Sequence, residues 1–205
     1  MIPRYAVLID PAIPPSASFW TPTAVELEED GAPGDFHDSE LVHTDASEAE
    51  EVLVAERIAI EFLDATYPSA REFDDAASAI EFEKPDIPSD DAPPFMTELV
   101  WYGVNGLELG VSGLVHALNA AGIVTSASCR SHNQSHYPWS DYPIVVFAAN
   151  REKLISLQPL VAASGCGFEI DDVNRAHLIA VIAPSVLEMM ALGRAVLGSL
   201  SEEPH

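Results

Sequence analysis

The order of apolar segments after residue 98 constrains the fold more than any other feature of this sequence. Apolar or alternating runs predict five strands, at residues 99–104, 123–128, 144–149, 168–173 and 178–183. Helical periodicity predicts three helices, which begin near Ser112, Asn150 and Pro184. The chain after residue 98 therefore has one strand, two helix-strand-strand units and a final helix. This order favours an α+β fold in which helices cover a mainly antiparallel sheet.

The two helix-strand-strand units end their helices with similar small residues. Ala120-Ala121-Gly122-Ile123 matches Ala162-Ala163-Ser164-Gly165 in outline. Two interpretations are open: an internal duplication, or the small residues that commonly end a helix.

The first 98 residues have a different composition, and we expect a different organisation there. They contain 24 acidic and 4 basic residues, so they carry −20 of the formal net charge of −24. Residues 1–46 predict a strand at Tyr5–Asp10 followed by a Pro/Ser-rich acidic arm. Residues 47–84 predict two acidic amphipathic helices, because Ser47/Glu50 and Ser69/Glu72 have capping-box spacing. Residues 85–97 form a Pro-rich linker to a core domain at 98–200.

Charge and apolar run lengths exclude several classes of protein. A net charge of −24 repels phosphate backbones, so direct nucleic-acid binding is not expected. No apolar run approaches the 20 or so residues that a membrane-spanning helix needs. With only Cys129 and Cys166, the chain has no disulfide framework, and a cytoplasmic location is the expectation.

The acidic first half suggests a binding or regulatory function. Complementary charge steers association, so a basic protein partner is expected, as for an immunity protein, an antitoxin or another defence-associated protein. The acidity could equally serve solubility or reflect a salt-tolerant source. In the final helix, Gly193 and Gly198 would permit close approach of a second copy, which would make the protein a homo-oligomer.

Chemical side chains are concentrated in one loop, between the strands predicted at 123–128 and 144–149. The loop contains a cysteine, two histidines and a tryptophan, and the residues of interest are Ser128, Cys129, Arg130, His132, His136, Trp139 and Asp141. Long loops between core strands often carry function. Ser128, Arg130 and Trp139 are the candidate binding residues.

Three interpretations of this loop are open. Cys129, His132 and His136 could bind zinc, with Asp141, Cys166, His116 or water as the fourth ligand, and would then support metal-assisted hydrolysis or group transfer. Cys129 could instead be a nucleophile whose pKa Arg130 lowers and which His132 or His136 deprotonates, while Asp141 orients the imidazole. In the third interpretation Cys129 is a buried apolar residue and the histidines are solvated.

The segment Leu114–His132 resembles a pattern in uncharacterised bacterial and phage proteins, where a helix and a strand lead into Ser-Cys-x-Gly-His. It is also faintly similar to the wybutosine-synthesising tRNA methyltransferase family, in which a strand ends in Ser-Ser-Cys-Ser-Gly-Arg. The first resemblance implies a site at Ser128, Cys129 and His132. Ser131 stands where both patterns have glycine.

Overall fold

The chain folds as an α+β protein, as the order of its apolar segments predicts. The computed structural model describes residues 1–28, 42–82, 107–132, 140–171 and 178–201. Its helices and strands are α1 Ala24–Glu28, α2 Ala46–Thr66, α3 Ala70–Phe82, α5 Ser112–Ala120, β1 Val124–Cys129, β2 Ile144–Ala148, α6 Arg151–Ala163, β3 Gly167–Asp171, β4 Leu178–Ile182 and α7 Val186–Ser201. The two helix-strand-strand units and the final helix are confirmed. The strand predicted at 99–104 lies outside the described residues.

The four described strands form one antiparallel sheet in the order β1-β2-β4-β3. The central strands β2 and β4 are buried along their whole length, which accounts for their continuous apolar sequences. Strand β1 lies at one edge and has an irregular register between Thr125 and Ala127. Cys129, its last residue, pairs with Ile144. The edge strand therefore ends at the start of the chemically rich loop.

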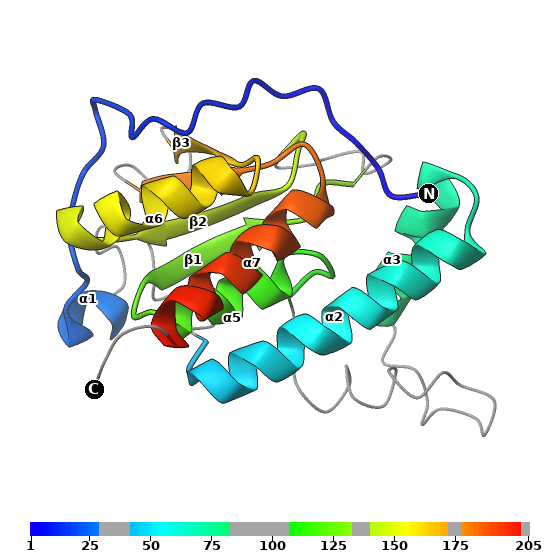
Figure 1. Cartoon of the computed structure of the whole chain (residues 1–205), viewed down its shortest axis with the longest axis horizontal. Helices are drawn as coiled ribbons and strands as arrows, with labels where there is room; N and C mark the ends of the chain where they lie inside the picture. The colour runs from blue at the N-terminus through cyan, green and yellow to red at the C-terminus, as the bar shows by residue number, and fades with distance from the viewer. Residues whose placement is uncertain (29–41, 83–106, 133–139, 172–177, 202–205) are drawn as a thin grey trace.

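Helices cover one face of the sheet, and the N-terminal segment packs on the other (Figure 1). Val145 and Phe147 of β2 belong to a core cluster with α2, α5, α6 and α7. Their neighbour Val146 belongs to a second cluster, together with residues 7, 9, 20 and 27 of the N-terminal segment. Alternate side chains of a strand point to opposite faces, so both faces of the sheet are covered by apolar side chains.

The strand predicted at Tyr5–Asp10 is wrong. These residues are extended but form no ladder with the sheet. The Tyr5 backbone N–H donates to the Pro184 carbonyl at 2.8 Å, and the Asp10 carbonyl accepts from the Phe168 N–H at 2.8 Å. The apolar residues of this segment cover the sheet face, so their pattern arises from packing on a sheet and not from membership of one.

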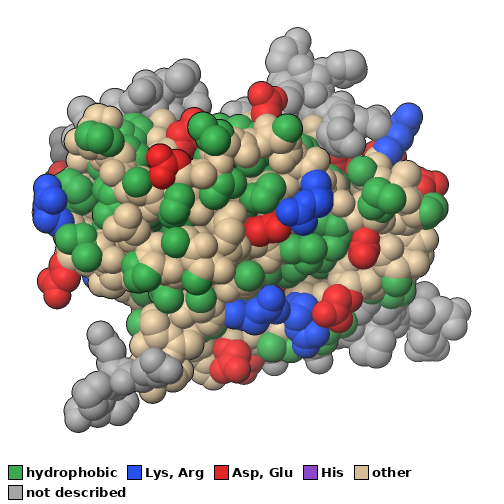
Figure 2. Space-filling view, turned by 45° about the horizontal axis from the view of Figure 1, so that its top comes forward, with side chains coloured by type: hydrophobic (Ala, Val, Ile, Leu, Met, Phe, Trp, Pro, Cys, Tyr) green, Lys and Arg blue, Asp and Glu red, His purple; other side chains and the backbone are tan. Residues whose placement is uncertain are grey.

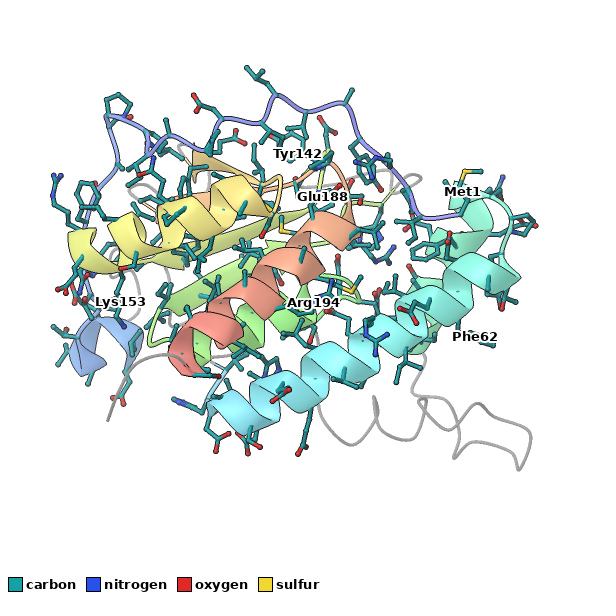
Figure 3. All side chains as sticks on the ribbon, viewed as in Figure 1. Met1, Phe62, Tyr142, Lys153, Glu188 and Arg194 are labelled. Carbon is teal, nitrogen blue, oxygen red and sulfur yellow. The ribbon has the colours of Figure 1, made fainter. Side chains whose placement is uncertain are left out.

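The N-cap of α2 is Asp45, two residues before the predicted N-cap Ser47. Asp45 forms the capping box with Glu48 in place of the predicted Ser47/Glu50 pair. The Ser69/Glu72 pair before α3 is confirmed, since the Glu72 N–H donates to Ser69 Oγ at 3.2 Å. Near the C-terminal end of α2, the amino group of Met1 lies 3.2 Å from the Asp64 carboxylate (Figure 3).

Glycines allow α2, α5 and α7 to pack closely. A Cβ atom on Gly193 of α7 would lie 3.0 Å from Leu53 Cδ2 of α2 and 3.4 Å from the backbone of Leu114 in α5. Gly193 therefore serves packing within one chain, whereas the homo-oligomer prediction assigned it to contact with a second copy. Gly198 is exposed, and its added Cβ would meet no atom within 4 Å.

Helices α5 and α6 end in the same way. Gly122 and Gly165 both have positive φ, of 68° and 75°. The next residue in each case closes the helix, with Ile123 N–H donating to Leu118 and Cys166 N–H to Val161. Gly122 thus corresponds to Gly165. The sequence match had paired Gly122 with the preceding residue, Ser164.

Charged side chains are dispersed on the face of the molecule that Figure 2 shows, and basic groups lie beside several of the acidic ones. Within the described residues, no helix combines the length and the apolar character that crossing a membrane requires.

Candidate metal centre

A tight turn after β1 places His132 near Cys129. Ser131 has φ of 69°, the only positive φ of a non-glycine residue in the described part of the chain. Its N–H donates to Cys129 Sγ at 3.3 Å, and its carbonyl accepts from the Tyr5 hydroxyl at 3.3 Å. Glycine adopts this conformation more readily, which matches the glycine of the two sequence patterns at this position. Ser131 adopts the positive φ of this turn although it is not glycine.

Glu108 completes the cluster from a different part of the chain, just before α5. One of its carboxylate oxygens lies 2.8 Å from His132 Nε2, and the other accepts from the Arg130 backbone N–H at 2.5 Å. The motifs in the sequence did not predict a role for Glu108. The available signal was that Glu108 is the only acidic residue between positions 99 and 140.

Two buried carboxylates fix the segment that carries Glu108. The Leu109 N–H donates to Glu81 of α3 at 2.6 Å, and the Gly110 N–H donates to Glu56 of α2 at 2.7 Å. Both acceptors come from helices of the acidic first half. The position of Glu108 therefore depends on α2 and α3 as well as on α5.

Glu108, Cys129 and His132 each offer one ligand atom, and these three atoms lie within 4.8 Å of one another. The Cys129 residue is 1% exposed, whereas the side chains of His132 and Glu108 are 20% and 15% exposed. The cluster is therefore closed on its sulfur side and partly open on its nitrogen and oxygen side.

Hydrogen bonds within the cluster hold a proton on His132, which a metal ion would have to displace. Hydrogen bonding with Cys129 and with Glu108 raises the pKa of His132 to about 10. Burial alone would raise the pKa of Glu108, but the hydrogen bonds from His132 and from the Arg130 backbone outweigh it and lower that pKa. The proton on His132 thus lies between groups that could instead bind a metal ion.

Arg130 was predicted as a binding residue, and the structure buries its guanidinium under α3. The residue is 2% exposed and pairs with Asp74 and with Glu81, the latter at 3.0 Å. A further hydrogen bond joins it to Ser78 at 3.3 Å. The guanidinium therefore links the turn to α3 and does not face the opening of the cluster.

The other predicted residues lie elsewhere. Asp141 is exposed and does not belong to the group of three. Ser128 is half-buried in β1, opposite Val145. The buried Cys166 donates to the Glu188 carbonyl at 3.4 Å, and it is not part of the cluster. His136 and Trp139 lie outside the described residues.

The cluster is chemically suited to two uses. Sulfur, nitrogen and oxygen donors together suit zinc and its neighbours in the first transition series. A Cys-His-carboxylate group is also the arrangement of a thiol nucleophile, with Glu108 in the role that the sequence assigned to Asp141. Burial separates the two uses, because a nucleophile must reach its substrate and Cys129 is almost completely covered.

None of the protein-family models, curated proteins or solved structures compared with this chain matches it. Functional inference therefore depends on the residues of the cluster themselves.

Proposed function

We propose that Glu108, Cys129 and His132 bind a divalent transition-metal ion, with zinc as the physiological candidate, and that the ion supports hydrolysis or group transfer. The observation that carries the proposal is the convergence of three donor atoms within 4.8 Å from two separate segments. Each segment is held by buried contacts, so the donors are arranged before an ion arrives. Prearranged donors are what a specific metal site requires.

Among the described residues, the three donors and their partial exposure favour a catalytic over a structural ion. Structural zinc sites usually have four protein ligands, whereas catalytic sites have three and leave a position for water or substrate. Here the partly exposed His132 and Glu108 border the open side. A bound water at that side would have its pKa lowered by the ion, which makes it a nucleophile near neutral pH.

Metal binding would require His132 and Glu108 to move apart. Two atoms on one tetrahedral zinc ion, each about 2.0–2.1 Å from it, lie about 3.3 Å apart. The His132–Glu108 separation is 2.8 Å, a hydrogen-bonding distance. Loss of the shared proton and a movement of about half an ångström would therefore convert the hydrogen bond into a pair of ligands.

Metal titration tests the proposal. Protein purified without added metal should bind one equivalent of zinc, and cobalt(II) should give the near-ultraviolet absorption of a thiolate ligand. Cys129→Ser and His132→Ala should abolish the cobalt(II) absorption and weaken zinc binding. Cys166→Ser is the matched control and should bind as the parent does. Unchanged cobalt(II) spectra for Cys129→Ser, or no stoichiometric zinc binding by the parent, would refute the site.

The proposal that acidic helices recruit a basic protein partner remains a prediction. Exposed carboxylates line α2 and α3, whereas Arg57 and Arg71 each already pair with a carboxylate four residues later. Binding of such a partner should weaken steeply with salt, because exposed charges are screened. Affinity that does not change with ionic strength would count against it.

A further inference from the structure

A groove lies between α2 and α7, and none of the proposed metal ligands lines it. Its volume is about 240 Å³. The lining residues are Glu50, Leu53, Val54, Arg57, Arg194, Leu197, Gly198 and Ser201. The volume is below the range typical of sites for drug-sized molecules, so the groove suits a small ligand.

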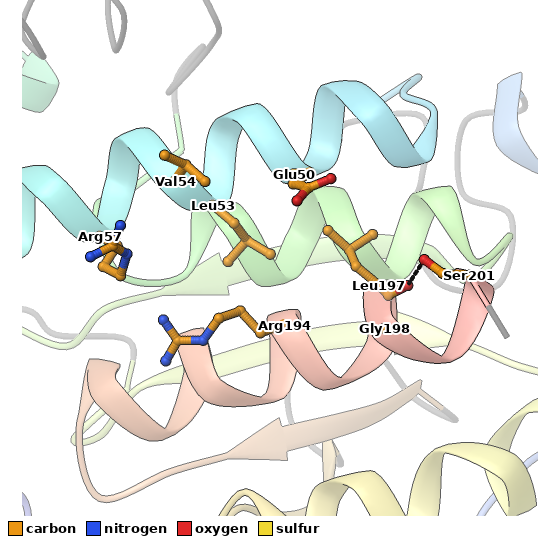
Figure 4. A pocket seen from close by; sticks show the side chains of 8 residues that line it. All are labelled: Glu50, Leu53, Val54, Arg57, Arg194, Leu197, Gly198 and Ser201. Atoms are coloured by element: carbon orange, nitrogen blue, oxygen red, sulfur yellow. Dashed lines mark hydrogen bonds between the residues drawn. The ribbon is translucent and has the colours of Figure 1, made fainter.

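Charge is unevenly distributed along this groove. Arg57 and Arg194 come from facing turns at one end, and Glu50 and Ser201 lie at the other (Figure 4). Arg57 pairs with Glu61 at 3.0 Å, in an exposed pair of the kind that contributes little. The groove therefore has a cationic end and an anionic end.

Arg194 is the unusual member. In the parts of the chain that the structure describes, every other lysine or arginine has an ion pair, a hydrogen bond or a ring contact, whereas Arg194 has none. Its side chain lies between α7 and α2 (Figure 3). Arg194 is exposed, so its guanidinium is accessible to a ligand in the groove.

The middle of the groove is apolar. Leu53 and Leu197 face each other across it (Figure 4). Gly198 leaves space beside them, because an added Cβ would contact nothing within 4 Å. Leu53 and Leu197 are only 5% and 9% exposed, whereas Val54 beside them is 43% exposed. A short hydrocarbon chain could therefore lie against Val54 and the exposed edges of the leucines while a charged group reaches the arginines.

We propose that this groove binds a small carboxylate with a short hydrocarbon chain. The carboxylate would accept hydrogen bonds from Arg194 and Arg57, a geometry that guanidinium groups favour. The hydrocarbon chain would cover Val54 and the exposed edges of Leu53 and Leu197. Glu50 repels an anion at the opposite end, so the ligand binds in one orientation.

Titration of the full chain with hexanoate tests this site. In ¹⁵N-resolved NMR spectra, hexanoate should shift the side-chain Nε–H signals of Arg194 and Arg57 in a saturable manner. Hexylamine, which has the same chain and the opposite charge, should not shift them. Acetate, which lacks the chain, should bind at least tenfold more weakly. Equal affinity for acetate and hexanoate, or no saturable shift, would overturn the proposal.

Variants locate the binding. Arg194→Gln should weaken hexanoate binding at least tenfold, whereas Arg71→Gln, which removes an exposed paired arginine on α3, should leave it unchanged. Gly198→Leu should block the groove, and Gly198→Ala is its control because a methyl group fits the open space. Both substitutions also replace a glycine by a better helix former, so lost binding would not reflect lost folding. Unchanged binding by Arg194→Gln and Gly198→Leu would place the ligand elsewhere and refute the site.

Discussion

Glu56 should make the protein less stable as pH rises from acid to neutral. This carboxyl group is fully buried, and it accepts hydrogen bonds from the backbone N–H groups of Gly110 and Gly113 at the start of α5. Burial raises its pKa to about 7, and the backbone hydrogen bonds only partly oppose this. We therefore predict that Glu56→Gln, which is neutral at every pH, removes a defined part of the pH dependence.

The sign and the magnitude follow from the two pKa values. A carboxyl whose pKa is higher in the folded state stabilises the fold when it is protonated, below its ordinary pKa of 4.5, and this contribution is lost as pH rises through 7. At 1.36 kcal/mol per pKa unit, the loss is about 3 kcal/mol. The parent protein should therefore lose about 3 kcal/mol relative to Glu56→Gln between pH 4.5 and pH 8.

Urea unfolding at a series of pH values measures this difference. Other titrating groups, including His132, affect parent and variant alike, so the difference between the two curves isolates Glu56. Glu61→Gln, an exposed change on the same helix, is the control and should not reproduce the difference of about 3 kcal/mol expected for Glu56→Gln. Parallel stability curves for the parent and Glu56→Gln would show that Glu56 does not titrate in this way.

Three further outcomes can be checked. Gly193→Ala should destabilise the protein by about 1–3 kcal/mol, because the added Cβ would lie 3.0 Å from Leu53. Gly198→Ala in the same helix should stabilise it by about 0.5–1 kcal/mol. Urea unfolding measures both changes, and equal effects would contradict the packing of α7. Arg130→Met should cost about 3–5 kcal/mol in the same assay, because two buried carboxylates of α3 lose their partner; a cost below about 1 kcal/mol would show that these charges are not buried together. Burial raises the pKa of Cys166 to about 12, so iodoacetamide at neutral pH should label this thiol only when the protein unfolds, and rapid labelling in the native state, detected by mass spectrometry, would refute its burial.

Local sequence signals predicted the elements, whereas the site depends on contacts between distant segments. The Ser69/Glu72 pair marked the start of α3 because its hydrogen bonds join residues only three positions apart. Cys129 and His132 could be predicted together because one turn joins them. Glu108 could not, since its approach to His132 depends on the packing of helices from the other half of the chain.

The same distinction explains the mistaken strand. An alternating apolar pattern reports that one side of a segment is buried, and it does not report whether the backbone joins a ladder. Val7 and Ile9 are partly buried against the sheet face without strand pairing. The flanking prolines could have distinguished this segment from a strand. Pro3 and Pro11 stand on either side of it, and proline has no N–H to donate to a ladder.

The strand order β1-β2-β4-β3 relates the two helix-strand-strand units to each other. It is symmetric: the second strand of each helix-strand-strand unit lies at the centre, and the first lies at an edge. Two separate copies of one such unit, paired about a twofold axis through their inner strands, would produce the same sheet. The matching helix ends at Gly122 and Gly165 extend this symmetry to the helices that precede the strands. An internal duplication is one of the two interpretations of the sequence, and it stays a prediction. Among the described residues, the cluster of Glu108, Cys129 and His132 breaks the symmetry, because it lies at the end of β1 alone.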